Sequence, residues 1–438
     1  MRHSLLLTLA LALTFGGVAA SATGPAPSFA ASKSYRTGAP PRAVAIADLN
    51  GDRRPDLVTA NGSADTVSVL LNSGAGRFRL GRQYVVARDA WALAVGDLNG
   101  DRRPDVAVAT PGGGSVSVLL NRGDGTFVPK HDVQIGHSAW SVALGDLNGD
   151  SRPDLVTAND EEPGSVSVVL NNGDGSFGSS VDYAAGSSPR AVAIGELNRD
   201  GRPDLAVASS GSRSNLFVLF NRGDGSFRPG RGYRTPYSPA SVAIGDLNGD
   251  RKQDVATVNE SGSVSVLANR GDGSFRRRRD YRTGGYPSTI AVGDVNGDRS
   301  LDLAITNGAG SVTVLANRGD GSFAAGLDYW SGRWPASVAI GRLNGDGRPD
   351  LAIANEFSKT VSVLINRPGL CTVQDVKGMT LPAAKQKLTH ADCRVGRVRR
   401  ASSKEIKTGL VISQRPRLGA VLRRGARVDL VVSLGRKR

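Results

Sequence analysis

Short stretches of alternating apolar and polar residues recur along most of the chain. One complete set runs through 92–96, 105–109 and 115–120, and Phe127 opens a fourth stretch. Period-two alternation rich in β-branched residues predicts strands, and the Gly-rich segments between them predict turns. The set of four returns every 48 to 50 residues, without helical periodicity between about residues 35 and 366. The pattern therefore predicts an all-β repeat protein.

Four strands per repeat at so even a spacing are typical of a β-propeller, whereas stacked β-sandwiches would not repeat one four-strand unit. Seven copies predict seven blades. The segment 28–35 matches the fourth strand at 322–329, but no blade precedes it. The third strand at 361–365 has no fourth strand after it. We expect these two ends to pair in the last blade, because pairing removes two exposed sheet edges.

An acidic nine-residue loop follows the first strand of each repeat, with oxygen-bearing side chains at positions 1, 3, 5 and 9. Calcium binds six to eight oxygen atoms, and the backbone carbonyl of position 7 can add to these side chains. Without an ion, the carboxylates would repel one another. The sequence therefore predicts structural calcium ions. The expected ligands are Asp48, Asn50, Asp52, Arg54 and Asp56; Asp97, Asn99, Asp101, Arg103 and Asp105; Asp146, Asn148, Asp150, Arg152 and Asp154; Glu196, Asn198, Asp200, Arg202 and Asp204; Asp246, Asn248, Asp250, Lys252 and Asp254; and Asp294, Asn296, Asp298, Ser300 and Asp302.

Two of the seven loops depart from this pattern at position 1. Glu196 in the fourth loop is a longer carboxylate that still supplies oxygen. Arg342 in the seventh loop removes a ligand and adds a charge of the ion's own sign. We expect Arg342 to pair with Asp346 and Asp350 in place of the metal, which leaves six calcium ions. The alternative for any single loop is an Asx-rich turn that binds no metal.

The repeats resemble the FG-GAP/VCBS repeats of seven-bladed β-propellers, similar to the head of integrin α subunits and to many exported bacterial proteins. The resemblance rests on the acidic loops and their spacing, and it covers roughly Phe29 to Asn366. It implies an all-β, seven-bladed propeller whose N-terminal strand closes the last blade. The function that we expect is binding or adhesion to a glycan or a protein.

Aromatic and arginine side chains gather in the connections from the fourth strand of one blade to the first strand of the next. In propellers these connections lie near the central channel, on the face opposite the acidic loops. Such side chains can stack on sugar rings or hold a protein loop, or they can simply pack between blades. The candidate ligand-binding residues are Trp91, Trp140, Trp334, Arg42, Arg190, Tyr237 and Tyr286.

Arg-Gly-Asp occurs four times, at 122–124, 222–224, 270–272 and 318–320. Each copy occupies the same repeat position between the third and fourth strands, where Gly and Asp favour a turn. We therefore predict hairpin turns and not adhesion motifs.

No catalytic constellation is evident among the four histidines, and the regular carboxylates belong to the acidic loops. We expect a protein that is not an enzyme. The alternatives are a polysaccharide-active enzyme, a lyase or hydrolase on a propeller scaffold, and a purely structural wall protein.

The pattern changes after residues 366–369. A short strand at 373–376, a helix with apolar residues at 381, 384 and 388, and strands at 409–414 and 427–433 follow. The motifs at 376–381, 409–416 and 431–435 resemble a PASTA domain, and the resemblance covers Cys371 to about Gly435. PASTA domains are associated with cell-wall kinases and penicillin-binding proteins, and some bind peptidoglycan. The two cysteines of the chain, Cys371 and Cys393, flank the helix and are expected to form a disulfide.

The basic start, the apolar run and the small residues near Ala20 predict a secretory signal peptide at 1–22, and no later stretch is long enough to span a membrane. The expected domains are therefore the signal peptide, a propeller at 23–369 and a PASTA-like domain at 370–438. The last 68 residues hold 17 Lys and Arg against 4 Asp and Glu, which leaves a net charge of only +2 before them. This charge favours peptidoglycan or an anionic wall polymer as partner. We expect a secreted, extracellular or wall-associated monomer that binds no nucleic acid.

Overall fold

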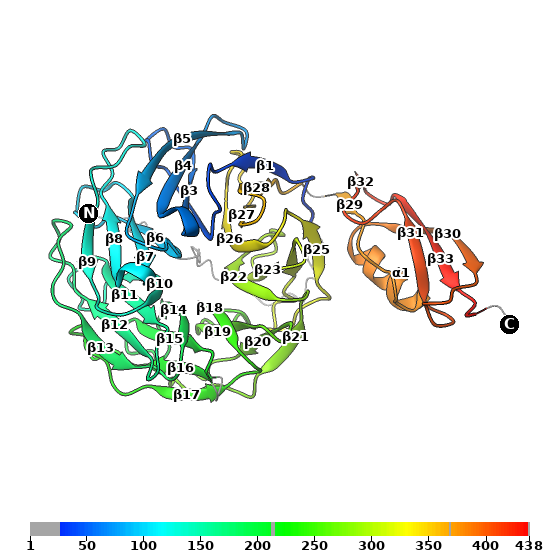
Figure 1. Ribbon diagram of the computed structural model, residues 1–438. Helices are drawn as coiled ribbons and strands as arrows, with labels where there is room; N and C mark the ends of the chain where they lie inside the picture. Colours follow the sequence, from blue (N-terminus) through cyan, green and yellow to red (C-terminus); the bar gives the residue numbers. More distant parts are fainter. Residues whose placement is uncertain (1–26, 212–214, 368, 437–438) are drawn as a thin grey trace.

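The computed structural model describes residues 27–211, 215–367 and 369–436 (Figure 1). The predicted signal peptide lies outside these residues. In the described part of the chain, no helix has the length and apolar character needed to cross a membrane.

Seven four-stranded antiparallel sheets form a ring, with their first strands innermost and their last strands on the rim (Figure 1). The even repeat of short, alternating segments produces this arrangement, and the predicted all-β propeller fold is confirmed. The strands, blade by blade, are β2 (Ala43–Ala47), β3 (Asp56–Asn61), β4 (Thr66–Asn72) and β5 (Phe78–Val85); β6 (Ala92–Gly96), β7 (Asp105–Thr110), β8 (Ser115–Leu119) and β9 (His131–Gln134); β10 (Ala139–Gly145), β11 (Asp154–Asn159), β12 (Ser165–Val169) and β13 (Val181–Ala184); β14 (Pro189–Gly195), β15 (Asp204–Ser209), β16 (Asn215–Leu219) and β17 (Arg231–Arg234); β18 (Pro239–Gly245), β19 (Asp254–Asn259), β20 (Ser263–Leu267) and β21 (Arg279–Arg282); β22 (Pro287–Gly293), β23 (Asp302–Asn307), β24 (Ser311–Leu315) and β25 (Leu327–Trp330); and β26 (Pro335–Gly341), β27 (Asp350–Asn355), β28 (Thr360–Leu364) and β1 (Lys33–Arg36).

The seventh sheet is closed by the N-terminal strand, as the sequence predicts. β1 pairs antiparallel with β28, with Tyr35 opposite Val361. The last blade then meets the first, where the Val44 amide donates to Ser337 Oγ at 3.3 Å. Among the described strands, the third strand of every blade is therefore paired on both sides.

The core lies between the blades. The second strand of every blade is buried along its whole length, and the four residues between its polar ends are mostly apolar. On the rim, a Tyr from the outer strand of one blade meets a Phe of the next edge to face, as Tyr233 meets Phe275 with ring centroids 5.0 Å apart. Similar pairs join five other blade interfaces.

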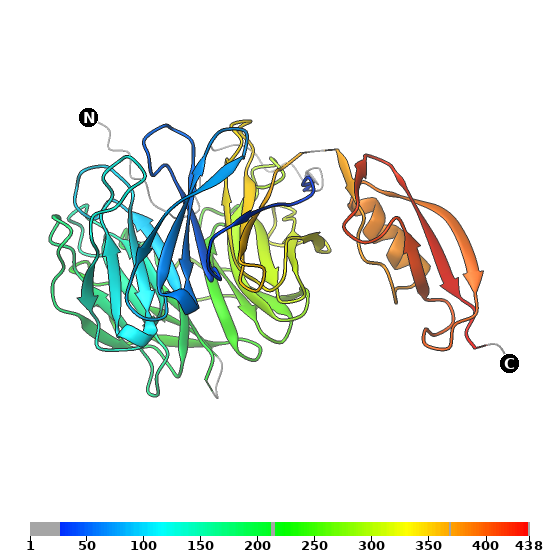
Figure 2. The same cartoon turned by 45° about the horizontal axis from the view of Figure 1, so that its top comes forward.

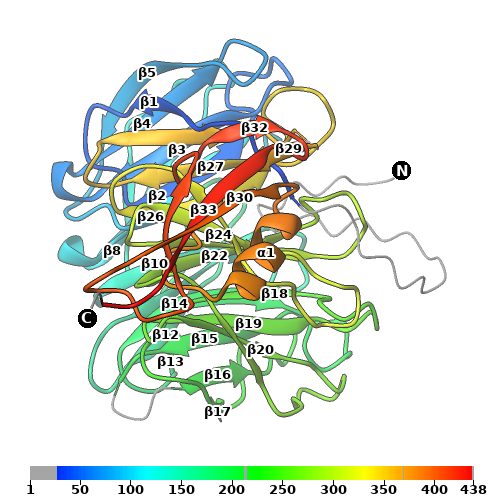
Figure 3. The same cartoon turned by 90° about the vertical axis from the view of Figure 1, so that its right-hand side faces the viewer.

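Two short 3-10 helices, η1 (Gly62–Ala64) and η2 (Pro111–Gly113), turn the hairpins between the second and third strands of the first two blades. The C-terminal unit is a second, smaller body at the edge of the ring (Figure 2), and it lies in front of the ring in the view of Figure 3. It holds β29 (Leu370–Thr372), α1 (Leu381–His390), β30 (Arg394–Ala401), β31 (Val411–Arg415), β32 (Val421–Arg423) and β33 (Arg427–Ser433).

The predicted helix and disulfide are both present in the C-terminal unit. Thr380 caps α1 by accepting a hydrogen bond from the Ala383 amide at 3.4 Å. The disulfide joins Cys371, on β29, to Cys393, just beyond α1. The unit contacts the sixth blade, where Gln374 bonds to the backbone of Asp328 and Lys387 lies 3.4 Å from its carboxylate.

Candidate binding face and acidic loops

The strand register places two kinds of loop on opposite faces of the ring. In the last blade, Gly341 pairs with Asp350 at the end that carries the acidic loop, whereas Pro335 pairs with Asn355 at the other end. The connections between blades and the hairpins between second and third strands therefore share the face away from the acidic loops. We call it the connection face.

The first acidic loop is held by its own side chains. Asp48 accepts hydrogen bonds from the backbone amides of Asp52 at 3.1 Å and Arg53 at 2.8 Å. Asp52 in turn accepts from the Arg54 amide at 2.9 Å. Position 6 adopts a left-handed conformation in the same loop, with a φ of 64° at Arg53. The carboxylates are thus used to fold the loop tightly, as in an Asx turn.

The aspartate at position 9 differs because it is completely buried. Both oxygens of Asp56 accept backbone hydrogen bonds, from Leu49 at 3.1 Å and from Asn72 at 2.7 Å. The pKa of Asp56 is raised to about 6, chiefly by burial; the two hydrogen bonds oppose this rise, and the charges of Asp52 and Asp48 contribute to it. The other blades repeat this: the pKa is raised to about 7 at Asp105, Asp204 and Asp254 and to about 6 at Asp154 and Asp350. Burial also raises the pKa of Asp302 well above its usual value.

The donor types of these loops suit calcium, since all are oxygen and the buried carboxylate would gain from a nearby cation. In the described residues, however, no three Asp, Glu, His or Cys side chains converge closely enough to hold a metal ion as they stand. Glu196 takes the same place as the shorter aspartates and accepts from the Asn198, Arg199 and Gly201 amides. Calcium binding therefore stays a prediction.

Arg342 does not behave as predicted. No ion pair joins it to Asp346 or Asp350. Asp346 instead accepts from the Arg348 amide at 2.9 Å, and Asp350 accepts from Leu343 and Asn366. The predicted pairing is wrong because both carboxylates are already held by backbone amides, which lie closer than a long side chain from position 1.

A buried asparagine in each blade was missed at the sequence level. Asn269 donates its side-chain amide to the Leu197 carbonyl of the neighbouring blade at 2.8 Å and to the Gln253 carbonyl at 2.9 Å. We call this side chain the asparagine latch. It recurs at all seven interfaces, through Asn72, Asn121, Asn171, Asn221, Asn317 and Asn366. In the sequence it is one more Asn at the start of a Gly-containing turn, so only its strict recurrence could have indicated the role.

Four candidate ligand-binding residues form one stack across the first four blades. The Arg42 guanidinium lies 3.8 Å from the Trp91 ring, Trp91 and Trp140 are 4.1 Å apart, and Arg190 lies 4.8 Å from Trp140. Arg42 also pairs with Glu356 at 2.8 Å. The stack is half-buried, and each of its side chains contacts another member of the stack. These residues join the blades around the channel.

The other three candidates are exposed on the connection face. Tyr237 and Tyr286 are 74% and 73% exposed, and Trp334 is 42% exposed. Trp334 stacks on Phe357, which was not among the predicted residues, with ring centroids 5.2 Å apart and planes within 18°. Gly308 lies between Tyr286 and Trp334, where a Cβ would approach both side chains. Tyr286, Trp334 and Phe357 thus form an exposed aromatic patch over the last two blades.

The Arg-Gly-Asp segments are hairpin turns, as predicted. Gly123 has a φ of 86°, and Asp124 accepts from the Thr126 amide and hydroxyl at 2.9 and 2.6 Å. These bonds also hold the pKa of Asp124 below its usual value. The Asp124 side chain therefore stabilises the turn in which it lies.

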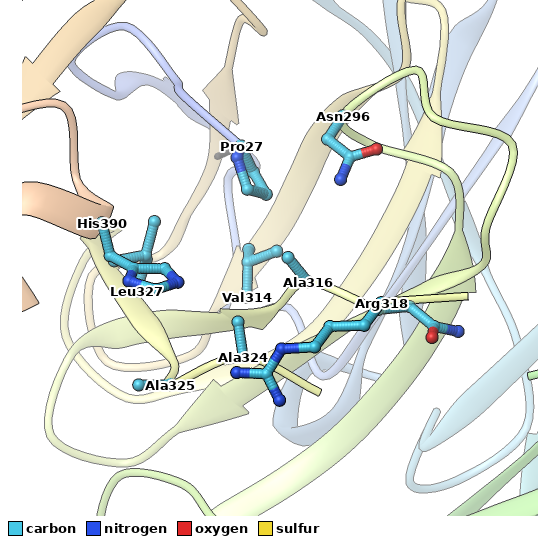
Figure 4. A pocket seen from close by; sticks show the side chains of 10 residues that line it. Pro27, Asn296, Val314, Ala316, Arg318, Ala324, Ala325, Leu327 and His390 are labelled. Atoms are coloured by element: carbon cyan, nitrogen blue, oxygen red, sulfur yellow. The ribbon is translucent and has the colours of Figure 1, made fainter. Parts of the chain in front are cut away.

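A small cavity lies where the sixth blade meets the C-terminal unit (Figure 4). Its volume is about 60 Å³, and it is lined by Pro27, Leu327, Arg318 and His390 among others. This space holds little more than water, so we assign no ligand to it.

Comparison with known families agrees with the fold. The family model for FG-GAP-like repeats matches six overlapping segments, at 48–108, 97–157, 146–207, 197–257, 246–305 and 294–353. The PASTA domain model matches 372–434. No curated protein matches the sequence.

Two solved structures of BBS1N in complex with ARL6DN, soaked with mercury and with lead, are similar in fold, with TM-scores of 0.56 and 0.55 at 14% identity. The matches cover 78% and 79% of this chain and 98% of those chains. A structure of an Agrocybe aegerita lectin that recognises non-reducing terminal N-acetylglucosamine matches with a TM-score of 0.47 and 19% identity, over 71% of this chain and 88% of that one.

Propeller repeats and a PASTA domain are typical of binding modules with a wall-binding domain, and no catalytic family is indicated. Because the repeat matches together span more than half of the sequence, the chain belongs to the FG-GAP-like repeat family.

Proposed function

We propose that this protein is a secreted binding module whose propeller holds a glycan or a protein segment on the connection face. The aromatic patch carries the proposal. Three large aromatic side chains exposed together at one place cost solvation energy unless they serve a contact. Flat rings of this kind stack on sugar rings or anchor a protein loop.

The acidic loops stabilise the face from the opposite side of the ring. In this proposal, six of them would hold calcium with the oxygen donors named above. When bound, calcium would neutralise carboxylates that the fold otherwise brings together. Its role is structural, and no catalytic step is assigned to it.

The PASTA domain would hold the module at a cell wall. Its surface is strongly basic, and along β30 the side chains of Arg394, Arg397, Arg399 and Arg400 are exposed. Attraction of this kind to anionic wall material weakens as salt rises. The full-length protein should therefore sediment with purified wall material at low salt and much less at high salt.

The aromatic patch is tested by Trp334→Ala combined with Tyr286→Ala, on a glycan array and in capture of wall-derived proteins. Loss of these rings should reduce binding about tenfold or more, since stacked aromatic anchors often dominate an interface. Leu80→Ala with Val181→Ala removes exposed apolar side chains from the rim and serves as the control. Equal binding by both double variants would rule out the patch as the ligand site.

A further inference from the structure

Arginine side chains gather on the rim of two neighbouring blades. They lie on the outer strands β17 and β21 and in the few residues before each strand (Figure 1). The eight residues are Arg228, Arg231, Arg234, Arg276, Arg277, Arg278, Arg279 and Arg282. We call this surface the rim arginines. Seven of them are exposed, and only Arg278 is partly buried.

Contacts within this surface bring the two strands together. Arg278 donates to the Arg234 carbonyl at 3.2 Å, which joins β21 to β17. It also pairs with Asp280 at 3.1 Å, the one acidic residue of the two segments 228–234 and 276–282. Among the described residues, no carboxylate forms an ion pair with the other seven guanidinium groups.

The other outer strands show that this charge is not needed for the fold. Charged residues on an edge strand do discourage edge-to-edge pairing. The third blade nevertheless has no Lys or Arg at the corresponding positions 178–184, and its outer strand β13 is equally an edge. The sixth blade has none at 324–330, where the C-terminal unit makes its contacts instead. A cluster of eight arginines therefore exceeds what edge protection requires.

We propose that the rim arginines bind a linear phosphodiester polymer of the cell wall. The proposal rests on the wall location given above but not on the aromatic patch. Guanidinium groups form paired, charge-assisted hydrogen bonds with phosphate oxygens. Seven extended residues span about 20 Å. A flexible chain of phosphates can follow such a stripe, whereas a compact anion would meet only one or two arginines.

Like charges held side by side repel, and a polyanion would relieve that repulsion while releasing its own counterions.

The binding surface is open on one side. An exposed hollow lined by Ser263, Asp280 and Arg282 adjoins the end of β21 and gives the polymer room to pass between rim and hairpin. Affinity should consequently fall steeply with added salt.

The test compares two full-length variants with equal loss of charge. One carries Arg276→Gln, Arg277→Gln, Arg279→Gln and Arg282→Gln, and it keeps Arg278 because that side chain joins the strands. The control carries Arg36→Gln, Arg77→Gln, Arg79→Gln and Arg82→Gln. These exposed arginines lie on the outer strands β1 and β5 or, for Arg77, directly before β5. Both variants should unfold at the wild-type temperature, because exposed substitutions change stability little.

The probe is a glycerol-phosphate polymer, measured against poly-glutamate and a DNA duplex of similar charge. The first variant should lose polymer affinity roughly tenfold or more, with a shallower salt dependence, while the control loses less than about threefold. Equal losses in both variants would show general attraction to the net charge and overturn the proposal. Tighter binding of poly-glutamate or of the duplex would overturn the choice of phosphodiester polymer. Failure of the glycan and protein tests at the aromatic patch leaves these outcomes unchanged.

Discussion

At the scale of single residues, the acidic loops divide their carboxylates between two tasks. Positions 1 and 5 fold the loop through its backbone amides, as Asp48 and Asp52 do. Position 9 is buried and tied to the next turn, as Asp56 is to Asn72. The seventh loop has lost the first of these groups at Arg342, yet its backbone bonds at Asp350 are intact. Position 1 is thus replaceable for folding, and we propose ion binding as the reason for its acidity.

Reciprocal substitutions at position 1 test that reason. Asp246→Ala should remove one calcium ion from the total, because it removes a charged ligand, and Arg342→Asp should add one. Calcium stoichiometry by isothermal titration measures both. Asp124→Ala, in a turn outside the loops, is the control and should leave the count unchanged. No gain of an ion with Arg342→Asp would contradict the proposed ligand set.

At the scale of elements, the strands and loops were predictable, because period-two alternation and the loop spacing are properties of the chain itself. The closing strand was predictable too, since Tyr35 repeats the position of Tyr329. The asparagine latch was not, because Asn at the start of a Gly-containing turn predicts that turn whether or not its amide crosses to another blade. The edge-to-face contact between Trp91 and Trp140 was equally hidden, since it depends on the distance between blades.

The latch gives a prediction for stability. Asn269→Ala leaves the Leu197 and Gln253 carbonyls buried without their donor and should lower the free energy of unfolding by about 2 to 4 kcal/mol. Urea denaturation measures the change. Asn172→Ala, in the corresponding hairpin but exposed, should cost less than about 0.5 kcal/mol. Equal effects would mean that the latch does not hold the blades together.

At the scale of the whole molecule, charge is distributed by blade and not by domain alone. The net charge of +2 before the C-terminal unit conceals eight arginines on two outer strands, balanced by the acidic loops elsewhere. Counting along the sequence could not reveal this, because the two rim segments lie 48 residues apart and meet only in the ring. The candidate ligand residues likewise separate into a half-buried stack and three exposed side chains only after folding.

The seven buried aspartates together give the calcium-free protein a pH dependence. Their pKa values are raised above the unfolded value of about 4. Their contribution to stability is therefore complete below about pH 4 and is lost as the pH rises through about 6 to 7. With a chelator present, the unfolding temperature should fall from pH 5 to pH 8. Added calcium should raise it more at pH 8, because metal binding needs the ionised carboxylate. An equal calcium shift at both pH values would contradict this prediction.

The closing strand also sets the order in which the molecule can be completed. Ser34 and Ser362 meet although 328 residues separate them, so β1 has no partner until almost the whole repeat array has been synthesised. Ser28 then bonds to Leu370 at the entrance of the C-terminal unit. Any chain that stops early keeps an open ring and an exposed edge, which proteases and chaperones recognise. A closed ring therefore forms only from a chain that contains every blade.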